Sequence, residues 1–186
     1  YRIRDYLMAG QYYQEFADTY PGSNNAEEAS YLAAMCEYYQ SPRPELDQAN
    51  TRKAIESFTI FMQRYPTSTH NDECKSRILE LQEKLVEKSY LSARLYYDLK
   101  EYRAATISLA NSLKEYPDTK YREELMFLKL DALYQYAVNS VPEKKVERYQ
   151  TTLDEYYSFI EEYPQSTFLR EANRISENTA KFLNVD

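Results

Sequence analysis

Four Tyr-Pro pairs divide this 186-residue chain into segments of similar length. The pairs begin at Tyr20, Tyr65, Tyr116 and Tyr163, so they lie 45, 51 and 47 residues apart. Proline has no backbone N–H and pushes the residue before it out of the α region, so each pair predicts the end of a helix. A helix end that recurs at this spacing predicts a repeat protein.

The residues before each Tyr-Pro pair repeat as well. In the second copy, Thr51, Ala54, Phe58 and Phe61 stand fourteen, eleven, seven and four residues before the tyrosine, and these steps place them on one helical face. The small residue lets a neighbouring helix approach, and the aromatic rings fill the space beside it. The equivalent sets are Tyr6, Ala9, Tyr13 and Phe16; Tyr102, Ala105, Leu109 and Ser112; and Tyr149, Thr152, Tyr156 and Phe159.

A second helix is predicted to start soon after each pair. Serine or threonine, the residue types that cap helix starts, follows two residues after each proline, at Ser23, Ser68, Thr119 and Ser166. A glutamate follows eight residues after each tyrosine, at Glu28, Glu73, Glu124 and Glu171. Paired acids could perform acid–base chemistry, but a favourable interaction with the positive end of each helix dipole explains the four glutamates without catalysis.

These patterns predict an all-α fold: a superhelical array of elongated antiparallel helix hairpins in one helical-repeat domain over residues 1–186. Two prolines make 41–48 an irregular loop, which Tyr39 and Leu46 could hold against the body. The expected units are a partial 1–21, then 22–66, 67–117, 118–164 and a C-terminal capping helix within 165–186. The expected helices span 5–20, 25–40, 47–65, 69–98, 100–116, 119–140, 143–163 and 167–183.

Both ends of the array carry expectations. The first copy has only Tyr1–Arg4 where a preceding helix should cover its apolar face, so we expect the natural chain to extend further towards the N-terminus. At the other end, a terminal helix needs a polar outer face. The residues suited to this role are Arg170, Glu171, Arg174, Glu177 and Lys181.

Composition argues against several classes of function. Phosphate and dinucleotide loops need clustered glycines, whereas Gly10 and Gly22 are the only two glycines and lie twelve residues apart. The net charge of -7 argues against a nucleic-acid partner, and a catalytic triad would depend on the single histidine, His70. No apolar run approaches the roughly 20 residues that span a bilayer. We therefore expect neither an enzyme nor a cofactor.

His70 and Cys74 are the strongest candidates for a metal site. They lie four residues apart on a predicted helix and so share a face, but two more ligands at a recognisable spacing are missing. Cys74 also occupies a small packing position of its repeat, which favours a buried thiol. A disulfide to Cys36 is disfavoured because the two cysteines lie at opposite ends of their helices. We therefore expect no metal.

The alanine, the aromatic residue four positions later and the proline twelve positions after the alanine resemble the second half of a tetratricopeptide repeat. Thr152 replaces the alanine in the last copy. A closer match lies in Ser41-Pro42-Arg43, Asp47-Gln48 and Thr51 together with the helix that follows. Tyr102-Arg103-Ala104-Ala105 and Tyr116–Glu124 extend the match. The whole chain resembles the BamD family of outer-membrane β-barrel assembly lipoproteins, shortened at its N-terminus.

This resemblance implies a non-enzymatic scaffold at the periplasmic face of the outer membrane. Family members are held there by an N-terminal lipidated cysteine that lies outside this chain. The resemblance implies that C-terminal repeats bind the barrel protein BamA and that N-terminal repeats bind unfolded outer-membrane proteins. The alternative is a general tetratricopeptide adaptor for peptides in another envelope or cytosolic complex. A groove lined by lysine and asparagine that clamps a carboxylate would favour that alternative.

The candidate partner-binding residues come from two patterns. Adjacent residues on a helix face different sides, so one tyrosine of each Tyr-Tyr doublet can pack inside while the other is exposed. We expect Tyr12, Tyr38 and Tyr96 to be the exposed members, although tyrosine can also serve as a simple core residue. Basic side chains that could meet an acidic partner, or form an ordinary solvated surface, are Arg103, Lys114, Lys129, Lys144 and Lys145.

Overall fold

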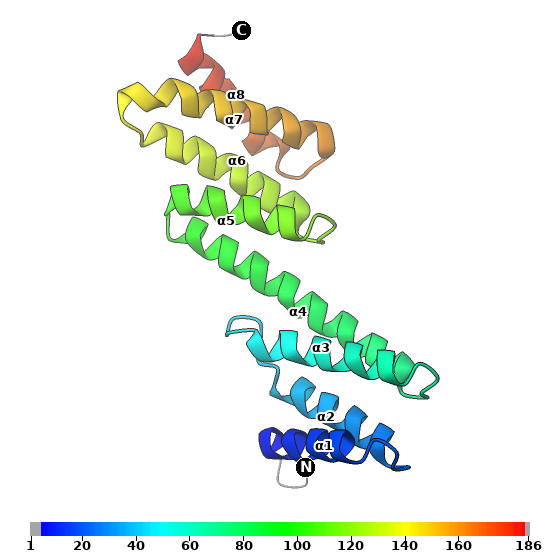
Figure 1. Cartoon of the computed structure of the whole chain (residues 1–186). Helices are drawn as coiled ribbons and strands as arrows, with labels where there is room; N and C mark the ends of the chain where they lie inside the picture. The colour runs from blue at the N-terminus through cyan, green and yellow to red at the C-terminus, as the bar shows by residue number, and fades with distance from the viewer. Residues whose placement is uncertain (1–4, 185–186) are drawn as a thin grey trace. The chain divides into compact units, whose positions relative to one another are not determined.

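The computed structural model describes residues 5–184, which form eight α-helices and no strand (Figure 1). The predicted all-α fold and its array of helix hairpins are confirmed, and every helix end lies within three residues of its predicted position. No helix among the described residues has the length and apolar character needed to cross a membrane. The helices are α1 (Tyr6–Thr19), α2 (Ala26–Gln40), α3 (Ala49–Arg64), α4 (Asn71–Asp98), α5 (Tyr102–Glu115), α6 (Arg122–Val138), α7 (Pro142–Glu162) and α8 (Leu169–Leu183).

The four Tyr-Pro turns have the same hydrogen-bond pattern. At the second turn, the Tyr65 N–H bonds to the Phe61 carbonyl at 2.9 Å, and the Ser68 N–H bonds to the Tyr65 carbonyl at 3.1 Å. The same two bonds recur around Tyr20, Tyr116 and Tyr163. The tyrosine therefore closes one helix, and its carbonyl organises the turn that leads to the next.

The prediction that the serine and threonine residues cap the helices is wrong, because these residues lie too early in the chain to reach the first turn of the helix. The Ser68 hydroxyl accepts a 3.1 Å bond from the N–H of His70, two residues ahead, while α4 begins only at Asn71. Equivalent bonds join Ser23 to Asn25, Thr119 to Tyr121 and Ser166 to Phe168. These hydroxyls stabilise the turn before each helix rather than the first turn of the helix itself.

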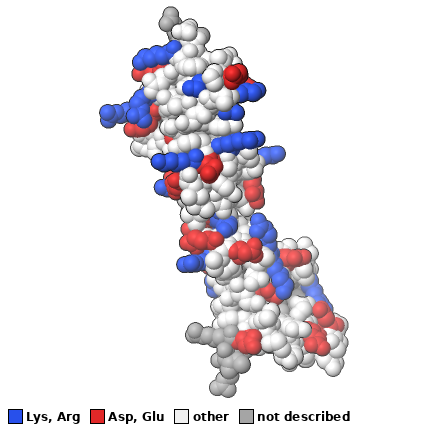
Figure 2. All heavy atoms as spheres, turned by 90° about the vertical axis from the view of Figure 1, so that its left-hand side faces the viewer, with Lys and Arg blue, Asp and Glu red and all other residues white. Residues whose placement is uncertain are grey.

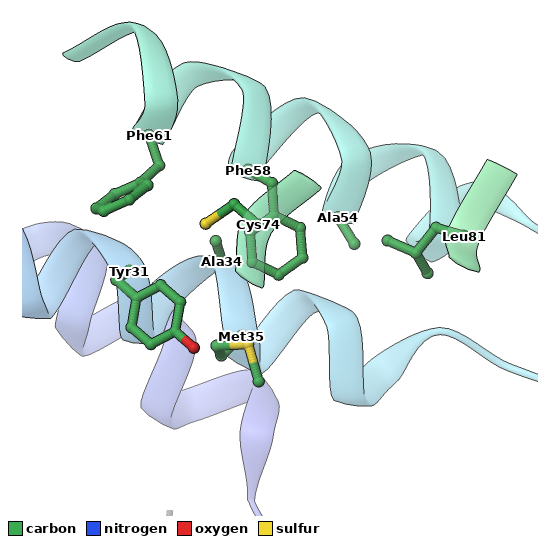
Figure 3. Packing of buried hydrophobic residues seen from close by; sticks show 8 residues of the cluster. All are labelled: Tyr31, Ala34, Met35, Ala54, Phe58, Phe61, Cys74 and Leu81. Carbon is green, nitrogen blue, oxygen red and sulfur yellow. The ribbon is translucent and has the colours of Figure 1, made fainter. Parts of the chain in front are cut away.

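The contacts divide the chain into two compact units, residues 1–88 and residues 89–186, and α4 contributes to both. Unit 1 has a core in which Phe58 and Phe61 of α3 point towards Tyr31 and Ala34 of α2, with Cys74 beside them (Figure 3). Unit 2 has two clusters, one around Leu109 and Leu125 and one around Leu130, Phe159 and Ile175. A single helical-repeat domain stays a prediction.

The predicted inward face of the repeat is confirmed on α3, where Thr51, Ala54, Phe58 and Phe61 are at most 1% exposed. The corresponding residues of α1, Tyr6, Ala9, Tyr13 and Phe16, are only half-buried in the structure. The predicted polar surface of the last helix is also confirmed. Its exposed side includes Arg170, Glu171, Arg174, Glu177 and Lys181.

The loop between α2 and α3 is held by one buried amide. Gln48 is 2% exposed, and its Nε2 donates to the carbonyls of Arg43 at 2.9 Å and Leu46 at 3.0 Å. Its Oε1 accepts a 2.7 Å bond from the Thr51 hydroxyl, which also lies 2.7 Å from Ser41 Oγ. The Ser-Pro-Arg…Asp-Gln…Thr motif therefore encodes the shape of this loop.

Two lysines of α4 complete this arrangement, because Lys84 Nζ donates to Ser41 Oγ and Lys88 Nζ to the Glu45 carbonyl, both at 2.8 Å. The expectation that Tyr39 and Leu46 hold the loop is wrong. Leu46 is 49% exposed, and Tyr39, which is also exposed, stacks on Tyr6 of α1.

Candidate partner-binding groove

Unit 1 contains an open groove of about 750 Å³ between α1 and α3, with α2 forming its floor. Its volume is within the range of sites that bind small ligands or short peptide segments. Both walls contribute long polar side chains, and the floor contributes Ala33 and Glu37. The lining residues are Leu7, Gly10, Gln11, Gln14, Glu15, Asp18, Ala33, Glu37, Lys53, Glu56, Ser57 and Ile60.

Small residues let α1 and α2 approach closely beneath this groove. A Cβ atom added to Gly10 would lie 3.0 Å from the Cβ of Cys36 and 3.8 Å from the Ala33 carbonyl oxygen. The facing surface of α2 supplies Ala29, Ala33 and Cys36, all at most 6% exposed. The part of the groove beside Gly10 and Ala33 therefore consists of backbone and short side chains, which leaves room for a ligand backbone above it.

Among residues 5–184 the lining of the groove is acidic, since it contains four carboxylates and one lysine. Glu37 forms a 2.6 Å ion pair with Lys53, and Asp18 forms a 3.3 Å ion pair with Arg64, which lies outside the lining. Glu15 on α1 and Glu56 on α3 are exposed and have no ion-pair partner among residues 5–184. The two walls thus each present one uncompensated negative charge.

The candidate tyrosines have different environments. Tyr12 is 62% exposed and Tyr96 is 43% exposed, as expected for surface members of their doublets. The expected exposure of Tyr38 is wrong, because its hydroxyl donates to Glu80 at 2.8 Å and Arg77 lies 4.9 Å above its ring. Tyr39 is the exposed member of that doublet, at 45%. Neither Tyr12 nor Tyr38 lines the groove of unit 1.

The candidate basic residues of unit 2 do not form one patch. Arg103 and Lys114 lie at opposite ends of α5, about 16 Å apart along the helix axis. Lys129 of α6 is only 25% exposed and pairs with Glu155 of α7 at 2.6 Å. At the start of α7, Lys144 pairs with Glu147 at 3.3 Å, and Lys145 beside it is half-buried. Figure 2 likewise shows basic and acidic side chains interspersed over the visible surface.

Three of these residues nevertheless occupy the same positions in their repeat as residues that line the groove. Counted from the nearest Tyr-Pro pair, Arg103, Lys114 and Lys129 occupy the positions of Leu7, Asp18 and Ala33, which line the groove of unit 1. The Lys129–Glu155 pair joins α6 to α7, as the Glu37–Lys53 pair joins α2 to α3. The equivalent surface of unit 2 is therefore basic along α5.

Stacked rings connect successive hairpins, and the later ring of each pair stands at the same place in its repeat. The residue five places after each of the last three repeat tyrosines stacks on a ring of the preceding part of the chain. The pairs, with their centroid distances, are His70 on Tyr31 at 3.9 Å, Tyr121 on Tyr90 at 4.1 Å and Phe168 on Phe127 at 4.5 Å. His70 Nε2 also lies 3.0 Å from Glu28 Oε2.

His70 and Cys74 therefore have structural contacts. Within residues 5–184, no cluster of three or more histidine, cysteine, aspartate or glutamate side chains could hold a metal ion.

The shifted pKa values arise from contacts between helices. The hydrogen bond from Tyr31 lowers the pKa of Glu73, and Arg77 acts in the same direction. Burial raises the pKa of Tyr90, whose hydroxyl donates to Glu124 at 3.0 Å. Burial also raises the pKa of the Cys74 thiol to about 11, so this thiol is protonated at neutral pH. Each of these groups packs one helix against another.

The charge pattern of the groove was present in the sequence but was not recognised there. Glu15 and Glu56 stand five and nine residues before their repeat tyrosines, and only the packing of α1 and α3 around α2 brings them to one groove. A comparison of the outward positions between copies shows that their charges differ. It locates the groove only when the packing shows which of these positions face it.

Residues 1–149 match the model of the YfiO family, described as outer membrane lipoprotein. A putative outer membrane protein assembly factor BamD from Aquifex aeolicus is 28% identical over 184 residues, which cover 98% of this chain and 58% of that protein. The outer membrane protein assembly factor BamD of Caulobacter vibrioides is 25% identical over 140 residues, covering 72% of this chain and 46% of that protein. The BamD of Haemophilus influenzae is 22% identical over 142 residues, with coverages of 71% and 54%.

The chain thus spans about half the length of the curated relatives it matches. The family match extends from α1 into α7 and includes the loop held by Gln48. It therefore covers all of unit 1 and more than half of unit 2. Since the matched region is about four-fifths of the sequence, this chain belongs to the YfiO family of outer membrane lipoproteins, the family of BamD.

Proposed function

We propose that this chain is part of a non-enzymatic scaffold in the assembly of outer-membrane β-barrel proteins. The observation that carries this proposal is the match of 98% of the chain to the Aquifex aeolicus protein, which is named a putative outer membrane protein assembly factor BamD. The proposed location is the periplasmic face of the outer membrane, with a lipid anchor on the full-length protein.

In this proposal the groove of unit 1 holds segments of unfolded outer-membrane proteins. Its open form and its two walls of long polar side chains suit an extended chain that passes through. A general adaptor that clamps a C-terminal carboxylate is a weaker reading. Lys53 is the only lysine that the described residues contribute to the lining, and it is paired with Glu37, while the uncompensated charges of the walls are negative.

Site-specific cross-linking tests client binding. A photoreactive residue at Gln11, on the wall of the groove, should cross-link to a purified, urea-unfolded outer-membrane barrel protein diluted into buffer. The same residue at Gln82, an exposed position of α4 outside the groove, should give little product. Equal products at the two positions would contradict a client site in the groove.

The proposal places the binding of a BamA-type barrel protein on the C-terminal repeats. Reversing the charge of Lys144 and Lys145 should weaken binding of the periplasmic domains of BamA and reduce its dependence on salt, because these lysines would face an acidic partner. The control Arg52→Glu/Lys75→Glu makes the same change in net charge on exposed residues of unit 1. Unchanged affinity of K144E/K145E would remove these lysines from the interface.

A further inference from the structure

We propose that the groove of unit 1 selects extended client segments that carry a lysine or arginine flanked by apolar side chains. This inference rests on the proposed client-binding function and adds the chemistry by which the groove would distinguish one segment from another. It is carried by the charges of the two walls, by the apolar side chains at their edges and by the contrast with the equivalent surface of unit 2.

The negative charge that remains in the groove comes from opposite walls. Ion pairs with Lys53 and Arg64 compensate Glu37 and Asp18. Glu15 on α1 and Glu56 on α3 have no such partner within residues 5–184 and line the same space of about 750 Å³. A cationic side chain placed between these walls would gain from both carboxylates, whereas an anionic side chain would be repelled by both.

Apolar contacts are available beside these carboxylates. Leu7 on α1 is 64% exposed and Ile60 on α3 is 53% exposed, and both line the groove. The floor between them is formed partly by Gly10 and Ala33, which leave space for a peptide backbone. In an extended segment, a basic residue and the leucine-like residues two positions before and after it share one face. Such a segment would cover these exposed side chains and place its charge between the walls.

The positions of α5 that correspond to the α1 wall show that the acidity of this wall is not a general property of the repeat, whereas Asp154 of α7 keeps an acidic residue at the position of Glu56. Leu7, Glu15 and Asp18 of α1 correspond in the repeat frame to Arg103, Asn111 and Lys114 of α5. The first wall therefore changes from acidic to basic between two copies that share the same turns and the same packing positions. A cationic segment is thus matched to unit 1 and mismatched to the α5 surface of unit 2.

Fluorescence anisotropy with two labelled peptides tests the selectivity. Both peptides are short and alternate leucine with serine, and the central leucine is replaced by lysine in one and by glutamate in the other, so that the charge shares a face with the remaining leucines. The lysine peptide should bind about fivefold more tightly at low ionic strength, and this preference should shrink as salt is added. The variant Glu15→Gln/Glu56→Gln should lose the preference while keeping the leucine-dependent affinity. The control Glu115→Gln/Glu161→Gln removes two exposed carboxylates of unit 2 and should keep the preference.

Three results would overturn the inference: equal affinity for the two peptides, no binding of either peptide, or a preference that survives E15Q/E56Q. The cross-link from position 11 to an unfolded barrel protein separates this failure from failure of the proposed function. If that cross-link persists without charge preference, the groove binds clients by another chemistry. If the cross-link and the binding of BamA are both absent, the proposed function itself is wrong.

Discussion

At the scale of single residues, Gln48 shows how one buried amide can determine the path of an irregular segment. The loop from Ser41 to Gln48 contains two prolines and lies outside any helix, so its carbonyls need partners from elsewhere. The Gln48 side chain supplies two strong bonds and accepts one from Thr51. A residue that looks like an ordinary polar loop position is therefore part of the core.

Replacement of Gln48 by alanine should lower the free energy of unfolding by about 2 kcal/mol, because it removes a buried amide together with its bonds to the Arg43 and Leu46 carbonyls and to the Thr51 hydroxyl. Urea denaturation followed by circular dichroism measures this loss. The control Asn50→Ala removes one long bond of 3.4 Å from an exposed residue and should change stability by less than about 0.5 kcal/mol. Equal effects of the two substitutions would show that burial of the amide is unimportant.

Gly10 is a second residue whose role depends on close approach. Gly10→Leu should destabilise the protein by about 2 kcal/mol, because its Cβ would already lie 3.0 Å from Cys36 Cβ before the rest of the side chain is added. The matched control is Gly22→Leu, since a Cβ at Gly22 meets no atom within 4 Å. Thermal unfolding of the two variants provides the comparison, and similar melting temperatures would refute the packing role of Gly10.

At the scale of helices, the sequence predicted all eight elements because proline and the three-and-four spacing are local signals. It placed the serine and threonine residues at the wrong point because their hydroxyls bond two residues ahead, before the helix begins. The predicted exposure of Tyr38 was also wrong. Adjacent residues face different sides of a helix, but this spacing does not say which of the two sides α4 will cover. Glu80 and Arg77, which hold Tyr38, lie some forty residues away in the sequence.

An ion pair joins the start of α6 to the end of α7 and makes a pH-dependent contribution. Arg122 donates to both oxygens of Glu162, at 2.5 and 3.1 Å, and this contact lowers the pKa of Glu162. A carboxyl with a lowered pKa in the folded state stabilises the protein above its unfolded pKa, about 4.3, and loses this contribution as the pH falls through its folded pKa. The pair is partly exposed, so its contribution is under about 1 kcal/mol.

Glu162→Gln should therefore lower stability at pH 7, and the difference from the unmodified protein should close as the pH falls below about 4. Urea denaturation at a series of pH values from 7 to 3 measures this difference. The neighbouring exposed carboxylate provides the control, and Glu161→Gln should follow the parent curve throughout. A gap that remains constant down to pH 3 would show that the ionised carboxylate is not the cause.

At the scale of the whole molecule, the division into two units predicts a local response to a core defect. Phe58→Ala should remove about 3 kcal/mol from unit 1, because Phe58 is fully buried there. Hydrogen exchange followed by mass spectrometry should show faster exchange in α1, α2 and α3 and little change in α6, α7 and α8. The conservative variant Phe58→Leu should have a smaller effect in the same helices. Equal acceleration along the entire chain would favour one cooperative domain.

The stacked rings that connect the hairpins also determine how each connection responds to the solvent. Tyr90 stacks on Tyr121 and also donates to Glu124, which is paired with Arg94 at 2.8 Å. Phe127 stacks on Phe168 and has no hydroxyl to donate. Sulfate salts screen ion pairs but strengthen the burial of apolar surface. Ammonium sulfate should therefore weaken the ion pair beside the Tyr90–Tyr121 stack and strengthen the apolar Phe127–Phe168 stack. The C-terminal hairpin should then pack more firmly at high sulfate concentration.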